Sequence, residues 1–333
     1  MKKIEGIVFF ILMGCFIFIA LPAQAETDAP ELPRFPYTLS AVSSLGLIYG
    51  QAEEIVYKYP DNEDYLSQLI WNMKPLFYAA SSLKFSRTDP RERISFFSRL
   101  TLKFGLSSKT GAVEDRDWMG TDHHDLTHFS FHNNHTQGSL FLDFSAGLTF
   151  PFRSGLLLNV YGTFVYMSFS WAARDGYFQY SPETAGDVYQ PWDESIPKQS
   201  AFGAVILYSQ KWMILTPGIS LYLPLFSFLG AEFSLQGSPI IFCTAEDDHL
   251  MRGIQFTDNI SEGIYFEPRG KLVFFPHKKI GFSLHISYRF LKGRGQTDSR
   301  SASHTESARL SNYDDAGAAY SALDAGLSFN IRF

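Results

Sequence analysis

The stretch IGFSLHISYRF, residues 280–290, decides the fold class of this protein. Its even-numbered positions are large and apolar, whereas its odd-numbered positions are glycine, serine, histidine or arginine. Successive side chains of a β-strand point to opposite faces, so this alternation predicts a strand with one apolar and one polar face. The same pattern recurs in residues 137–150 and 323–333.

The composition indicates where such strands belong. Aromatic residues make up 16% of the 333 residues, with 32 Phe and 17 Tyr. After the N-terminus, no segment reaches the ~20 uninterrupted apolar residues that a membrane helix needs. Strands of about ten residues, apolar toward lipid and polar toward a lumen, are typical of a transmembrane β-barrel. An alternating strand that ends on Phe333 also resembles the assembly signal of bacterial outer-membrane proteins.

The N-terminal residues predict export. Lys2 and Lys3 precede a mostly apolar run over residues 7–21, and small residues lead to Ala25. This order is typical of a secretory signal peptide. We expect residues 1–25 to be removed and residues 26–333 to form one outer-membrane β-barrel domain. Only Cys243 would remain, so the fold is expected to be stable without an intrachain disulfide.

The alternation predicts an all-β fold, a ten-stranded antiparallel transmembrane β-barrel with long extracellular loops. The strands are expected at Thr38–Tyr59, Tyr65–Phe85, Ile94–Val113, Gln137–Phe150, Gly155–Ala172, Ala201–Tyr222, Phe228–Thr244, Glu262–Phe275, Ile280–Lys292 and Ala319–Phe333. The long connections are expected at residues 114–136, 174–200, 245–261 and 293–318. With both termini in the periplasm, the third and seventh strands end at the same extracellular rim.

Two acidic motifs stand at these two strand ends. In the third strand the odd positions face the lumen, so Asp115 and Asp117 are expected to point inward, about 7 Å apart. Like charges at that distance raise the pKa of at least one carboxyl. In the seventh strand the even positions face inward, whereas Asp247 and His249 are at odd positions. They face inward only if the alternation shifts by one residue. We expect a bulge at residues 237–239, where a Gly-Ser-Pro sequence occurs.

These motifs resemble those of the omptins, ten-stranded outer-membrane proteases of Gram-negative bacteria. The resemblance is carried by Asp-Arg-Asp-Trp-Met at residues 115–119 and Asp-Asp-His at 247–249, and it extends to residues 46–73, 170–176 and 208–211. It implies an endopeptidase in which a water molecule attacks the scissile carbonyl. His249 would be the general base and Asp247 would orient its imidazole. Asp115 and Asp117 would hold the water and the tetrahedral intermediate.

The resemblance also implies a preference for basic substrates. Glu54 aligns with a glutamate that lines the family's P1 pocket, which accepts Arg or Lys, although an exposed acid at the rim is the alternative. The second acid of that pocket is replaced here by Ala245. Glu246 is adjacent, but consecutive residues of a regular strand face opposite sides. Gly120 replaces an acidic residue that usually follows Trp-Met. We therefore expect cleavage next to basic residues, with a weaker preference than is typical of the family.

Other partners and functions are weighed against this one. The formal net charge of −6 does not favour nucleic-acid binding. Five histidines at 123, 124, 128, 132 and 135 could bind a metal, but most His-rich loops do not, so no metal site is expected. Members of the family depend on lipopolysaccharide, and Lys211 stands where they have Arg. The first rival function is a catalytically inactive barrel that acts as an adhesin. A porin-like channel is disfavoured because side chains largely fill so small a lumen.

Overall fold

The computed structural model describes residues 37–58, 64–87, 94–120, 124–152, 155–186, 188–276, 279–301 and 316–333. The expected signal peptide, residues 1–25, lies outside the described residues. Within the described ranges, no helix is long and apolar enough to cross a membrane.

The described residues form strands, as the alternation predicts. These are β1 (Tyr37–Tyr57), β2 (Tyr65–Arg87), β3 (Ser95–Gly105), β4 (Lys109–Asp117), β5 (His128–Pro151), β6 (Leu157–Tyr180), β7 (Glu183–Ala185), β8 (Val188–Tyr189), β9 (Gln199–Phe226), β10 (Leu229–Ser238), β11 (Ile241–His249), β12 (Ile254–Phe274), β13 (Ile280–Ser301) and β14 (Ala316–Arg332). Twelve of them belong to one sheet, and β7 and β8 form a separate two-stranded sheet.

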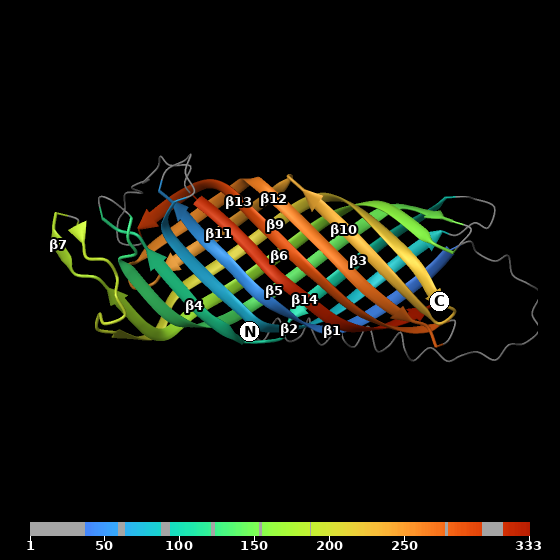
Figure 1. The fold of residues 1–333 in the computed structure, drawn as a ribbon, viewed down its shortest axis with the longest axis horizontal. Helices are drawn as coiled ribbons and strands as arrows, with labels where there is room; N and C mark the ends of the chain where they lie inside the picture. The colour runs from blue at the N-terminus through green and yellow to red at the C-terminus, as the bar shows by residue number, and fades with distance from the viewer. Residues whose placement is uncertain are drawn as a thin grey trace, which may run out of the picture. The chain divides into compact units, whose positions relative to one another are not determined.

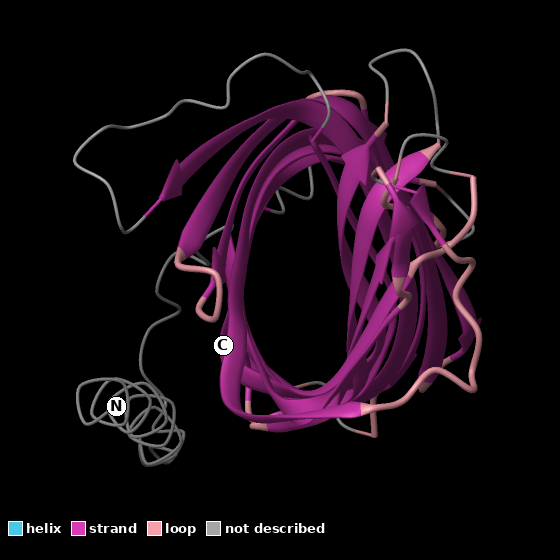
Figure 2. Ribbon diagram, turned by 90° about the vertical axis from the view of Figure 1, so that its left-hand side faces the viewer, coloured by secondary structure: helices cyan, strands magenta, loops and turns pink. Residues whose placement is uncertain are grey.

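The large sheet closes into a ring of long, oblique strands (Figures 1 and 2). Every pairing in it is antiparallel, and β1 pairs with both β2 and β14. β3 and β4 follow each other end to end in one place of the ring, and each pairs with both β2 and β5. β10 and β11 do the same between β9 and β12. The all-β antiparallel prediction is therefore confirmed, with two places in the ring each filled by two consecutive strands.

An apolar band surrounds the outside of the ring. In β13, Phe282, Leu284 and Ile286 are exposed, whereas the alternating Ser283 and Ser287 are buried inside. Large exposed apolar residues continue around the other strands, up to Tyr49 in β1, Phe242 in β11 and Ile264 in β12. Because lipid contacts such a band, the chain beyond it lies outside the membrane-spanning part. The acidic motifs all lie beyond the band.

The strands extend further than the alternation predicts. β4 and β5 occupy much of the connection expected at residues 114–136, and only residues 250–253 separate β11 from β12. These predicted boundaries are wrong for a physical reason. Beyond the apolar band, outward-facing positions contact water instead of lipid, so polar residues occupy both faces. The alternation then disappears, although the hydrogen-bonded ladder continues.

The inward direction of both acidic motifs is confirmed. Asp115 and Asp117 are 5% and 9% exposed, even though residues 106–108 interrupt the ladder between β3 and β4. The expected seventh strand corresponds to β10 and β11. Its ladder ends at Ser238 and resumes at Ile241. Before this break the even positions face inward, and after it the odd positions do. The irregularity expected at residues 237–239 therefore turns Asp247 toward the interior.

Aromatic side chains fill the interior beside the acidic motifs. Trp71 stacks on Tyr208 and on Trp171, with ring centroids 5.2 Å and 5.9 Å apart. These rings lie close to the motifs, because Trp71 pairs with Val113 and Tyr208 pairs with Asp247. Deeper in the ring, Arg289 Nε donates to Glu267 Oε2 at 2.7 Å. These packed and ion-paired side chains support a filled lumen, in agreement with the argument against a porin.

Candidate active site

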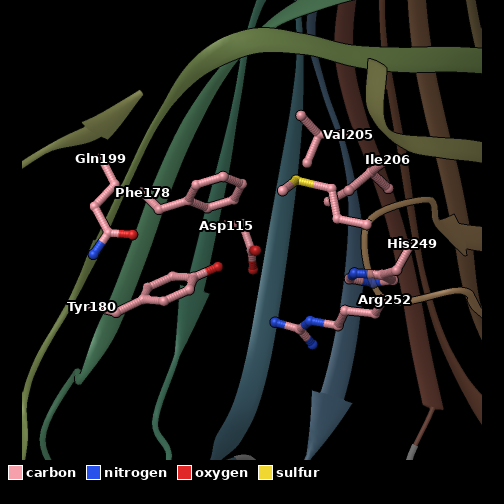
Figure 3. Close-up of a pocket in the computed structure, with 9 residues that line it drawn as sticks. Asp115, Phe178, Tyr180, Gln199, Val205, Ile206, His249 and Arg252 are labelled. Atoms are coloured by element: carbon pink, nitrogen blue, oxygen red, sulfur yellow. The ribbon is translucent and has the colours of Figure 1, made fainter. Parts of the chain in front are cut away.

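One residue of each acidic motif, Asp115 and His249, lines a cavity of about 250 Å³. Asp115 reaches it from β4 and His249 from the end of β11 (Figure 3). Tyr180 from β6 and Arg252 from the β11–β12 connection also line it. The ring closure thus brings together side chains that are more than a hundred residues apart in the sequence.

Asp247 and His249 form a pair at one side of the cavity. They stand two residues apart on β11 and share its inner face. His249 Nε2 lies 2.6 Å from Asp247 Oδ2, in an ion-pair contact that is not aligned as a hydrogen bond. Asp247 is 1% exposed, while the His249 side chain retains 13% exposure to the cavity. A buried carboxylate beside an imidazole fixes the orientation of the ring.

Asp115 on the other side has an unusual electrostatic environment. Burial raises the pKa of its carboxyl well above the ordinary value, and the charges of Asp117 and Asp247 raise it further. Arg252 and a hydrogen bond from Ser130 act in the opposite direction. The net effect is a carboxyl group that retains its proton more strongly than an ordinary aspartic acid. The expectation that the Asp115–Asp117 repulsion raises a pKa is confirmed for Asp115.

A chain of polar contacts supports Asp115 from behind. Ser130 Oγ donates to Asp115 Oδ2 at 3.4 Å, and His132 Nε2 lies 3.0 Å from Ser130 Oγ. His132 Nδ1 in turn lies 2.7 Å from the carbonyl oxygen of Asp175, which favours a proton on Nδ1. Sequence analysis missed Ser130 because it stands in a segment interpreted as a loop. The alternation of Ser130, His132 and Asn134, all buried, would have indicated a strand.

Arg252 is the second residue that sequence analysis missed. It lies in the short connection after β11, and no pattern distinguishes it there. In Figure 3 its guanidinium group lies below His249, on the side of the cavity that Tyr180 and Asp115 face. Tyr180 shares a hydrogen bond with Arg252, and the positive charge lowers the pKa of Asp115. A cation is therefore available beside Asp115.

Glu54 also points into the site and is not an exposed rim acid. It lies on β1 and is only 4% exposed. Burial raises the pKa of Glu54, and Asp247, Asp258 and Asp115 add to this effect.

The histidines do not form a metal centre in the described part of the chain. His123 lies outside it, His124 is exposed, and the remaining three lie on β5. His128 contacts Thr127, with Nδ1 2.9 Å from Oγ1. Among the described residues, no three His, Cys, Asp or Glu side chains are grouped to hold a metal ion.

Comparisons with known proteins bear on this arrangement. A family model described as the Omptin family matches residues 35–331. The solved structure of the outer membrane protease OmpT from Escherichia coli matches with a TM-score of 0.77 and 16% identity, covering 92% of this chain and 100% of that chain. The outer membrane protein OprG from Pseudomonas aeruginosa matches with a TM-score of 0.37 and 6% identity, over 89% of this chain and 95% of that chain. No curated protein matches the sequence.

The likeness to OmpT concerns the fold, since the two sequences are only 16% identical. The family model, in contrast, spans nearly all of the chain that the structure describes. The resemblance found in the motifs is thereby confirmed: the chain belongs to the omptin family and has the β-barrel fold of an outer-membrane protease.

Proposed function

We propose that this chain is an endopeptidase of the bacterial outer membrane that hydrolyses peptide bonds with a water molecule activated by His249 and Asp247. One observation carries the proposal. His249, which contacts Asp247, and the proton-retaining Asp115 line one cavity. A base on one side and a hydrogen-bond donor on the other are what attack of water on a carbonyl requires.

The first step is attack by water. The Asp247 carboxylate beside Nε2 favours the proton on that nitrogen, so Nδ1 of His249 is left to accept a proton from water. The water oxygen then bonds to the carbonyl carbon, and the carbonyl electron pair moves to its oxygen. Protonated Asp115 can donate to this oxyanion, and the charge of Arg252 stabilises it in a site sheltered from solvent. In this proposal Asp117 accepts the second hydrogen bond of the water.

The second step is collapse of the tetrahedral intermediate. The carbon–nitrogen bond breaks as the carbonyl re-forms. The imidazolium of His249 returns its proton to the leaving nitrogen, which departs as an amine. The other product is a carboxylic acid. Since water is the nucleophile, reagents directed at serine or cysteine should not inhibit the enzyme, and Cys243 is buried.

Protein or peptide substrates with basic residues fit the charge of the site. Glu54, Asp115, Asp117 and Asp247 place four carboxyl groups at one rim, with Arg252 as the cation beside Asp115. We propose that this rim faces the outside of the cell and that Glu54 binds a basic P1 side chain. We propose also that outer-membrane lipid, such as lipopolysaccharide, supports activity through Lys211, which lies outward and contacts Glu246 at 3.7 Å.

The test is cleavage of peptides that contain Arg or Lys by the refolded chain in detergent. His249→Ala should lose about 10²–10⁴-fold in rate, the usual contribution of a general base. His124→Ala is the matched control, because His124 is exposed and should leave the rate unchanged. Full activity in His249→Ala would refute the mechanism. Failure of the wild-type chain to cleave any such peptide would favour the rival function, an inactive barrel that acts as an adhesin.

A further inference from the structure

The position that lacks an acid in this chain has a carboxylate directly opposite. Ala245 on β11 pairs in register with Asp258 on β12. Directly opposite residues of an antiparallel pair have Cβ atoms about 5 Å apart and on the same face of the sheet. Both are buried, so this shared face is the interior of the ring. A carboxylate at position 258 therefore reaches the same space that one at position 245 would occupy.

Asp258 faces the site because β12 changes direction locally. Deeper in the ring, the inward residues of β12 are Tyr265 and Glu267, at odd positions. The register with β13 shifts between Ile260 and Glu262, and beyond this point Asp258 and Ile260 are the buried residues. Without this irregularity Asp258 would face outward. Sequence analysis missed Asp258 because it stands in a segment expected to be a loop.

Glu54 provides an independent indication of a missing ligand. Its Oε2 atom is buried and has no hydrogen-bond partner in the described part of the chain. With the residue only 4% exposed, solvent does not replace that partner. Asp247 and Asp258 are buried in the same interior, and their charges raise the pKa of Glu54. A buried carboxylate oxygen without a donor is costly, and a cation that enters beside it relieves this cost.

We propose that Asp258 supplies the second carboxylate of the P1 pocket, in place of the acid that Ala245 lacks, and that Glu54 and Asp258 together bind the guanidinium or ammonium group of the substrate. This inference rests on the proposed peptidase function. It replaces the expectation of a weak basic preference, because the acid that is missing from β11 is supplied by the facing position on β12. Ala245→Asp should consequently add little, because it places a third carboxylate beside Asp258.

The experiment compares kcat/KM for two matched peptides that differ only at P1, Arg against norleucine. In Asp258→Asn the Arg-to-norleucine ratio should fall roughly 10- to 100-fold, the range of one charge-assisted hydrogen bond, with norleucine cleavage retained. Glu54→Gln should lower the ratio similarly. Glu262→Gln is the matched control, because Glu262 is an exposed acid on the same strand. It should leave the ratio as in the wild type.

The outcomes separate the two proposals. An unchanged ratio in Asp258→Asn, together with a lowered ratio in Glu54→Gln, would overturn the assignment of Asp258 and leave the peptidase function intact. Loss of cleavage of both peptides by the wild-type chain would overturn the function itself. If Asp258→Asn does not fold, the double variant Ala245→Asp/Asp258→Asn returns a carboxylate to the facing strand. It should restore the preference for Arg, and failure to do so in a folded protein would overturn the inference.

Discussion

Replacing Asp258 by Asn should stabilise the protein at alkaline pH and not at acid pH. Burial, with a further contribution from the charge of Asp247, raises the pKa of Asp258 from 3.8 to about 7. An acid whose pKa is raised in the folded state binds its proton more strongly there than in the unfolded chain. Stability is therefore lost as pH rises from the unfolded pKa toward the folded one, and it stays lost above it.

The magnitude follows from the shift. At about 1.36 kcal/mol per pKa unit, the cost of ionising Asp258 in the folded protein reaches about 4 kcal/mol at about pH 8. At about pH 4 the carboxyl is largely protonated in the folded state, and the cost is close to zero. Asn has no such dependence. The free energy of unfolding of Asp258→Asn should thus exceed that of the wild type by an amount that grows with pH.

The assay is urea unfolding in lipid vesicles, followed by tryptophan fluorescence at about pH 5 and about pH 8. Midpoints are converted to free energies with the measured dependence on urea concentration. Glu262→Gln, which removes an exposed acid from the same strand, should differ little from the wild type at either pH. The reasoning would be refuted if Asp258→Asn showed the same difference from the wild type at both pH values. A folded state that is destabilised by ionised Asp258 agrees with a pocket that a basic ligand completes.

Three further outcomes follow from the same geometry. Arg252 lowers the pKa of Asp115, so Arg252→Ala should raise that pKa and move the alkaline limb of the kcat/KM profile to higher pH; a shift to lower pH would contradict the role of protonated Asp115. Gly176 has a φ of 111°, and a Cβ atom there would clash with the Phe131 carbonyl oxygen, so Gly176→Ala should lower the free energy of unfolding by more than ~1 kcal/mol in the same urea assay. Added lipopolysaccharide should raise the peptidase rate in detergent, and less so in Lys211→Gln; an equal response in both proteins would remove Lys211 from the lipid site.

The sequence alone determined the fold class and the direction of most strands. Alternation such as that in residues 280–290 arises because each strand in the apolar band contacts lipid on one face and the filled interior on the other. Because the two faces have different surroundings, apolar and polar residues alternate with a period of two, and this pattern is visible in the sequence. It also placed Asp115, Asp117, Asp247 and His249 at one rim, including the shift near Pro239 that turns the last two inward.

Only the tertiary structure decided which side chains complete the site. Beyond the band both faces of a strand contact water or polar groups, so the alternation ends and segments such as residues 128–136 resembled loops. Ser130 and Asp258 were hidden there, and Arg252 lies in a connection without any pattern. Their proximity to Asp115 and Ala245 depends on strand register, which local irregularities such as the one at Ile260 and Glu262 set. Register is a relation between distant segments, so it is established only when the ring closes.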